Sequence, residues 1–204
     1  MRLSRHPVRR ILLTLNLLLM AASAHAFDLA QLSRQLSEPA VIRGAFTQEK
    51  YLRALPLPLT SRGIFVLARD RGLLWLLQEP LQQDYRISDS GIARRGPSGW
   101  QQTDQQGPAQ RQNDLFLAVL QGDTTALQHD FELELSGTTE TWQLALTPRS
   151  QLLGQIFSAI LIRGGATVER IELLETQGDS TVLLLNDSQI DDQLSPTELH
   201  DFAD

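Results

Sequence analysis

Residues able to act as a catalytic acid, base or nucleophile are sparse after residue 26 of this 204-residue chain. The two histidines there, His129 and His200, lie far apart in the sequence, and no His-x-x-x-His or Gly-x-Ser-x-Gly pattern occurs. His129 stands beside Asp130, which we interpret as a surface pair, and the Gly-Pro-Ser-Gly run at 96–99 is typical of a turn. The sequence therefore favours a protein that is not an enzyme.

Residue types that bind metals or carry a covalent lipid are missing or poorly spaced. The chain has no cysteine, which excludes disulfides, thiolate metal sites, a thiol nucleophile and a lipid anchor on an N-terminal cysteine. The acidic group Asp187, Asp191 and Asp192 lacks the glycine and glutamate spacing of a calcium loop. We interpret it as a solvated segment, and we expect no metal and no cofactor.

The remaining candidate chemistry is that of apolar surfaces. Leu73, Trp75 and Leu77 share one side of a strand predicted for residues 73–77, and Leu74 and Leu76 share the other. Such a strand is usually covered on both faces, so core packing is the default interpretation. The same wall binds lipid if it meets movable helices, because burying an acyl chain gains about 0.8 kcal/mol per methylene. Further candidates for this wall are Trp142, Leu144 and Leu146.

The charge balance argues against nucleic acid as a partner. Residues 27–204 carry 14 basic and 24 acidic side chains, a net charge near −10. A protein that binds phosphate backbones needs a basic surface, and the arginines here are scattered singly along the chain. The 42% hydrophobic composition suits one globular domain, which we place at residues 27–204.

Residues 1–26 have the features of a secretory signal. Four arginines precede an apolar run at 11–22, and Ala24-His25-Ala26 has the small-x-small pattern that a signal peptidase requires. We predict cleavage after Ala26 and a periplasmic mature protein. An uncleaved N-terminal anchor is the alternative, although the apolar run is shorter than the roughly 20 residues that span a bilayer.

The pattern of apolar residues and turns predicts a mainly β (α+β) fold. Predicted strands cover 41–51, 63–69, 73–77, 84–88, 131–135, 142–146, 159–162, 167–175 and 181–185, with glycine turns between several of them. Short helices are predicted at 29–36, at 115–120 with Asp114 as N-cap and Gly122 at the end, at 152–157 as a helical turn, and at 196–202. Residues 94–113 are predicted to be a long polar loop around Trp100. These elements suit one curved antiparallel sheet with a few short helices on one face.

Several motifs occur in a fixed order between residues 44 and 92. They are Phe46-Thr47-Gln48, Ser61-Arg62-Gly63, Arg69 six residues before Trp75, and Ser88-Asp89-Ser90-Gly91. This order resembles the periplasmic outer-membrane lipoprotein carrier family (LolA-like). Trp142-x-Leu144-x-Leu146-x-Pro148 and the turn at 178–181 continue the resemblance over most of residues 27–185.

The resemblance implies an unclosed antiparallel half-barrel whose concave face is closed by short helices and holds acyl chains. It also implies that Arg69 points inward and latches these helices, for which a guanidinium with five donors is suited. An exposed turn arginine is the alternative. The side chains implied to contact lipid are Phe46, Phe65, Leu67, Leu73, Trp75, Leu77, Ile87, Trp142, Leu144 and Leu146.

The function implied is that of a monomeric carrier, which takes lipoprotein acyl chains or other acyl lipids from an inner-membrane exporter to an outer-membrane acceptor. Asp70 stands where the family typically has proline, and an acidic helix replaces the terminal strand of the general carriers. These departures leave a LolA-related branch from acyl-lipid or aryl-polyene pathways open. The other candidate classes are a lipid-sensing, protein-binding module on the same fold and an envelope hydrolase, for which no nucleophile is found.

Overall fold

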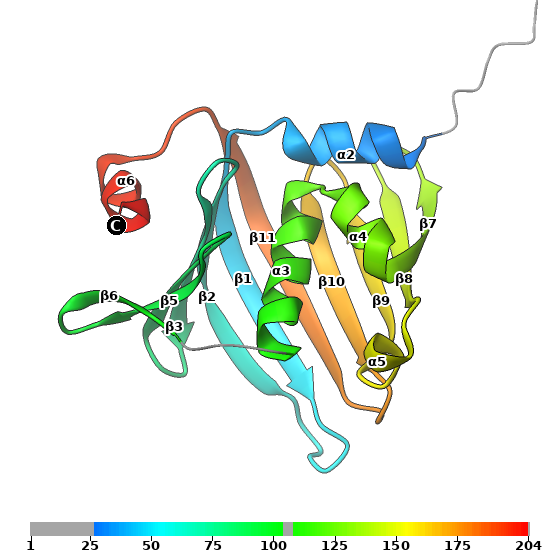
Figure 1. Ribbon diagram of the computed structural model, residues 1–204. Coiled ribbons are helices and arrows are strands. Elements are labelled where there is room, and N and C mark those ends of the chain that lie inside the picture. Colours follow the sequence, from blue (N-terminus) through cyan, green and yellow to red (C-terminus); the bar gives the residue numbers. More distant parts are fainter. Residues whose placement is uncertain (1–26, 104–107, 204) are drawn as a thin grey trace, which may run out of the picture.

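One antiparallel sheet of eleven strands dominates the part of the chain that the computed structural model describes, residues 27–103 and 108–203 (Figure 1). The strands are β1 (Val41–Tyr51), β2 (Leu59–Ala68), β3 (Gly72–Glu79), β4 (Gln83–Ser88), β5 (Gly91–Gly96), β6 (Gly99–Gln102), β7 (Phe131–Gly137), β8 (Trp142–Pro148), β9 (Phe157–Gly164), β10 (Val168–Glu175) and β11 (Ser180–Asp191). The helices are α2 (Leu29–Ser37), α3 (Pro108–Gln121), α4 (Thr124–Asp130), α5 (Gln151–Gly154) and α6 (Pro196–Phe202).

The sheet consists of two meanders that meet in its centre. Its strand order is β6-β5-β4-β3-β2-β1-β11-β10-β9-β8-β7. The chain runs outward from β1 to β6, crosses through α3 and α4, and returns from β7 to β11, which pairs with β1. Because the edge strands β6 and β7 do not pair with each other, the sheet stays open. This arrangement confirms the predicted half-barrel with short helices.

Alternation along the strands separates two apolar clusters. The larger one includes Ile42, Phe46 and Leu73. It lies on the concave face of the sheet, which α2, α3 and α4 cover (Figure 1). The smaller one lies on the convex face, where Val66 and Leu74 pack against Phe202 of α6. Strand β3 is therefore covered on both faces, which explains its continuous apolar sequence.

Local signals account for the ends of two helices and two hairpins. Asp28 and Gln31 form a capping box at the start of α2, and Ser195 and Glu198 form one at the start of α6. Gly72 and Gly91 close the β2–β3 and β4–β5 turns with φ of 103° and 110°, a region that favours glycine. The helices and hairpins predicted at these places are confirmed.

The prediction of a long loop at 94–113 is wrong. Strands β5 and β6 form a hairpin whose turn is the Gly-Pro-Ser-Gly run at 96–99, and α3 already begins at Pro108. The strands are polar because they form one edge of the sheet, where Trp100 packs against the guanidinium of Arg95 at 4.4 Å from its ring centroid. Alternation of apolar residues is weak in such a hairpin, so the period-2 signal does not detect it.

Several other elements differ from their prediction in extent, and one was missed. Asp114 lies inside α3 and is not its N-cap, because the Ala, Gln and Arg residues before it favour a helix. Helix α4 was not predicted, although Asp123 caps it. Strand β11 continues through polar residues to Asp191 because their backbone pairs with β1, with a register shift near Gly44. Backbone pairing thus extends elements beyond their apolar residues.

Candidate functional site

A cavity of about 340 Å³ lies between the concave face of the sheet and helix α3. Seven strands and this helix contribute to its wall, and apolar side chains dominate it. The lining residues are Gln48, Lys50, Trp75, Tyr85, Ile87, Ile92, Leu115, Phe116, Val119, Ile160, Ile171, Leu173, Thr181 and Leu183. Pockets for small ligands typically measure about 300–1,000 Å³, so this cavity has room for one slender apolar ligand.

Trp75 joins the sheet to the helix at this cavity. Its indole stacks on Phe46 with ring centroids 3.6 Å apart, and Phe116 of α3 meets it edge-on at 5.4 Å. Phe65 lies behind it at a centroid distance of 6.4 Å. Three aromatic rings therefore fix the position of Trp75, whose remaining surface faces the cavity.

One end of the cavity is polar. Lys50 of β1 lies directly opposite Thr181 of β11, and Gln48 precedes Lys50 by two residues on the same face of β1. The Lys50 ammonium lies 3.5 Å from a carboxylate oxygen of Glu175, and its side chain is 42% exposed. This end of the cavity therefore opens to solvent, whereas Ile160, three strands away in the same cross-strand row, is fully buried.

Two of the predicted lipid-contacting residues, Trp75 and Ile87, line the cavity. The others lie on the same concave face in the apolar cluster, as the alternation predicts. Phe46 and Phe65 support Trp75, and Leu77 is half-buried beside it. The residues packed into the core without lining the cavity are Leu67, Leu73, Trp142, Leu144 and Leu146. For all ten, contact with lipid stays a prediction.

Trp142 has a structural role beneath α2. Its indole Nε1 donates a hydrogen bond to the Gly165 carbonyl at 2.8 Å, and it is 2% exposed. The amide of Gln35 on α2 donates to the same carbonyl at 2.5 Å. The Gly165 carbonyl thus fixes one end of α2 to the sheet through two donors.

Sequence reasoning missed the part of the cavity wall formed by α3 and by the strands β9 to β11. Leu115, Phe116 and Val119 follow the helical spacing from which this helix was predicted, but none of the three was named as a lipid-contacting residue. The alternation of Ile171 with Leu173 also marks an apolar face, yet no pattern in one strand shows that this face borders a cavity. Gln48, Lys50 and Thr181 resemble ordinary solvent-facing strand residues.

Arg69 lies exposed in the turn between β2 and β3. Its guanidinium makes no hydrogen bond or ion pair with the described residues, whereas its backbone carbonyl accepts from Nε2 of Gln121 at the end of α3, at 3.3 Å. The link between this turn and α3 is therefore made by the carbonyl. A latch formed by the guanidinium stays a prediction.

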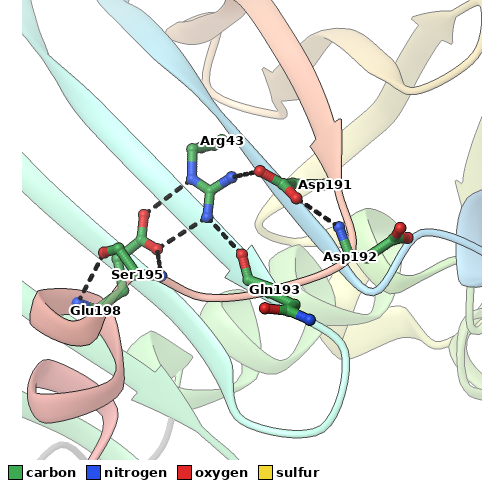
Figure 2. Close-up of polar contacts among 6 residues, drawn as sticks. All are labelled: Arg43, Asp191, Asp192, Gln193, Ser195 and Glu198. Atoms are coloured by element: carbon green, nitrogen blue, oxygen red, sulfur yellow. Dashed lines mark hydrogen bonds and ion pairs between the residues drawn. The ribbon is translucent and has the colours of Figure 1, made fainter.

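The convex face holds a second polar arrangement, which attaches α6 to the sheet (Figure 2). Arg43 of β1 donates to both carboxylate oxygens of Glu198 at 2.9 Å, to Asp191 at 2.8 Å and to the carbonyl of Gln193 at 2.9 Å. The bidentate pair is one of the strong forms of charge-assisted hydrogen bond. Hydrogen bonds from Arg43 lower the pKa of Glu198 to about 2.

Two further arginines hold the end of α6. Arg86 is 8% exposed and donates to the carbonyl of Ala203 at 2.6 Å, and Arg95 pairs with Asp201 at 2.6 Å. Hydrogen bonds from the backbone N–H of Asp192 and from Arg43 lower the pKa of Asp191. Asp191 is exposed, but its ion pair with Arg43 makes it part of the attachment of α6. On the convex face, these contacts are all made within the chain, and they hold α6 over β2 and β3.

The titratable residues that the structure describes form no acid–base pair at the cavity. His129 lies exposed at the end of α4 and contacts Asp130 at 2.9 Å, while His200 is on α6 at the convex face. Within residues 27–103 and 108–203, no group of three or more His, Cys, Asp or Glu side chains is placed to hold a metal ion. None of the helices described there combines the length and hydrophobicity that crossing a membrane requires.

Comparisons with known proteins agree with this architecture. Residues 21–195 match the family described as outer membrane lipoprotein carrier protein LolA-like. No curated protein matches the chain. Among solved structures, the fold is similar to MucB in complex with MucA(peri), with a TM-score of 0.50 and 15% identity over 84% of this chain. The Pseudomonas aeruginosa MucA/MucB complex gives a TM-score of 0.50 and 17% identity over 84% of this chain.

The chain spans only 57% and 58% of the two matched chains in these complexes. A LolA superfamily protein from Nitrosomonas europaea is matched over 85% of this chain and 97% of its own length, with 11% identity and a TM-score of 0.46. At 15% and 17% identity, the likeness to the two MucB structures shows a shared fold alone.

Proposed function

We propose that this chain, which belongs to the LolA-like family of outer membrane lipoprotein carrier proteins, is a non-enzymatic carrier of acyl lipids. It takes up the acyl chain of a lipoprotein or another lipid at the inner membrane and delivers it to an acceptor at the outer membrane. The cavity between the sheet and α3 holds the chain. Residues 1–26, which lie outside the described residues, act in this proposal as the export signal, cleaved after Ala26.

The observation that carries the proposal is the apolar cavity at a sheet–helix contact. Its walls come from two separate layers, which meet through the side chains of Trp75 and Phe116. A cavity between two layers can open by a shift of the helix, without breaking the hydrogen bonds of the sheet. Each methylene that enters gains about 0.8 kcal/mol, so a chain of ordinary length is held firmly.

Exposed leucines beside the open end of the cavity support exchange with a membrane or a carrier partner. Leu59 lies opposite Lys50 on the neighbouring strand and is 54% exposed, and Leu57 in the preceding loop is 75% exposed. Exposed apolar residues in a group mark interaction sites. An acyl chain leaving at Lys50 therefore passes along an apolar surface.

A second candidate is a lipid-sensing module that binds a partner protein on the same fold. The likeness to MucB, whose solved structure is a complex with MucA(peri), favours it. Both candidates use the same cavity. They differ in the outcome of loading, which is delivery of the lipid in the first and a change in partner binding in the second.

Fluorescence of Trp75 tests the location of the lipid. Titration with a fatty acid should shift the tryptophan emission of the wild-type protein, because the chain replaces water at the exposed part of the indole. Trp75→Phe should abolish the shift. Trp100→Phe is the matched control, since Trp100 packs near Arg86 and Arg95, away from the cavity. An equal shift in Trp75→Phe would place the lipid elsewhere.

A transfer assay separates the two candidates. A carrier should speed the movement of a fluorescent acyl lipid from donor to acceptor vesicles in proportion to its concentration. Binding of the lipid without any acceleration of transfer would support the sensing module and contradict the carrier.

A further inference from the structure

We infer that the polar end of the cavity, formed by Gln48, Lys50 and Thr181, binds the anionic head group of a single-chain amphiphile. The carboxylate or phosphate would lie against Lys50, with the alkyl chain extending past Trp75 and Phe116. This inference rests on the proposed function, because it identifies the class of lipid that the same cavity selects.

The register of the sheet brings the three polar side chains together. Lys50 and Thr181 are direct cross-strand neighbours, and Gln48 lies two residues before Lys50 on the same face. Side chains in such positions lie about 4.5–5.5 Å apart at Cβ when directly opposite, which is within reach of one small anionic group. All three line the cavity.

Much of their hydrogen-bonding capacity is unused. Thr181 is only 9% exposed, yet neither its hydroxyl nor the Gln48 amide has a hydrogen-bond partner among the described residues. The Thr181 hydroxyl is not fully buried, so it can donate or accept a hydrogen bond within the cavity that it lines. Lys50 has three donors and contacts one acceptor, Glu175, at the long distance of 3.5 Å. An anionic group at this place would provide acceptors for all three side chains.

Lys50 is the only lysine in the sequence. Among the described residues that line the cavity, it is also the only charged one. An ammonium on a flexible stem is a compact point charge that adapts to head groups of different geometry, whereas a guanidinium is suited to fixed bidentate partners. The single lysine therefore places an ammonium, paired at long distance with Glu175, at the open end of a cavity that is apolar along its length.

The size of the cavity restricts the ligand further. A volume of about 340 Å³ lies at the lower end of the range for ligand pockets, which suits one chain better than a bundle of chains. The combination of one narrow apolar space and one cation selects a fatty acid or a lysophospholipid-like phosphate over neutral or cationic lipids of the same chain length.

Competition binding with four twelve-carbon probes tests this selection. Dodecanoate and dodecyl phosphate should bind the full chain at least about tenfold more tightly than dodecanol, and dodecylamine should bind most weakly. Comparison of the first two probes distinguishes a carboxylate from a phosphate ligand. Lys50→Gln should reduce the preference for the anions to less than about twofold while leaving the affinity for dodecanol unchanged.

Arg62→Gln is the matched control for charge. Arg62 also forms an ion pair with a glutamate, Glu79, at 3.2 Å, but it lies outside the cavity and its side chain is 60% exposed. This variant should keep the full anion preference. An equal loss of preference in both variants would show a general effect of net charge and overturn the inference.

Selective labelling of Lys50 gives a readout independent of affinity. An amine-reactive reagent can modify one side chain in this protein, so mass spectrometry reports its accessibility directly. Saturating dodecanoate should slow the labelling of Lys50 severalfold, and dodecanol should not. Equal binding of anions and dodecanol would overturn the head-group site but leave the carrier intact, whereas failure of all four probes to bind would contradict the proposed function itself.

Discussion

Phe116 of helix α3 stands edge-on to Trp75 of strand β3, with ring centroids 5.4 Å apart and an interplanar angle of 89°. On the sheet side, Phe46 stacks on the same indole at 3.6 Å. Trp75 is thus held rigidly by the sheet and contacted at its edge by the helix. A shift of α3 away from the sheet would break the contact between Phe116 and Trp75 and widen the cavity.

Phe116→Ala should therefore speed the release of a bound acyl probe. Loss of an edge-to-face aromatic contact costs about 0.5–1.5 kcal/mol, which corresponds to a rate increase of about two- to tenfold. Stopped-flow displacement of the probe measures this rate. Leu152→Ala is the control, because Leu152 is an exposed leucine of α5 outside the cavity. An unchanged release rate in Phe116→Ala would show that α3 does not control exit.

Gly63→Ala should destabilise the protein by about 1–3 kcal/mol, because overpacking forces neighbours to shift. A Cβ at Gly63 would lie 2.7 Å from a ring carbon of Phe46 and would collide with the backbone carbonyl of Leu76. The variant would thus displace the ring on which Trp75 stacks. Urea unfolding measures the effect, with Gly154→Ala as control, since a Cβ there meets no atom within 4 Å. Equal stability of the two variants would contradict this account.

Glu198 should make the attachment of α6 sensitive to acid. Its pKa in the folded chain is about 2, below the ordinary value of 4.5, so its contribution is complete above pH 4.5 and is lost as the pH falls towards 2. Glu198→Gln should lower the free energy of unfolding at pH 7 by about 1–2 kcal/mol and flatten its dependence on pH over this window.

Denaturant unfolding between pH 2 and pH 7 measures that dependence. Glu79→Gln is the control, because Glu79 pairs with Arg62 on the surface, where both side chains are at least 60% exposed. A pH dependence in Glu198→Gln equal to that of the wild type would show that the contact with Arg43 contributes nothing to stability.

Arg69→Leu should retain cargo and slow its transfer, while the stability stays within about 0.5 kcal/mol of the wild type because the side chain is exposed. The variant removes a donor that can bond helix carbonyls when α3 shifts, and one charge-assisted hydrogen bond corresponds to about a tenfold change in rate. Arg71→Leu, in the same exposed turn, is the control. Wild-type transfer by Arg69→Leu would identify Arg69 as an ordinary turn residue.

The sequence predicts the parts of the fold that depend on local signals. Strand β1 was predicted with its observed bounds, Val41–Tyr51, and the capping residues Asp28 and Ser195 mark the starts of two helices. The edge hairpin around Trp100 was missed, because its side chains are mostly polar and show no clear alternation of apolar and polar residues. Local patterns therefore indicate elements with a buried face and fail at edges.

The candidate site depends on contacts between distant parts of the chain, and only a small part of its lining follows from the sequence. Trp75 and Ile87 lie on strands whose apolar faces are visible as alternation. Lys50 and Thr181 come together only because β1 pairs with β11, a pairing set by the return of the second meander to the centre of the sheet. No local pattern contains that information.

The most direct test of the central claim is native mass spectrometry of the protein isolated from its own host. The wild-type protein should carry the additional mass of one acyl compound. Leu173→Trp, which fills the cavity, should lose it, and Leu174→Trp, at the next residue of β10 and outside the cavity, should keep it. An acyl compound retained by Leu173→Trp, or none found on the wild-type protein, would contradict an acyl-lipid carrier that uses this cavity.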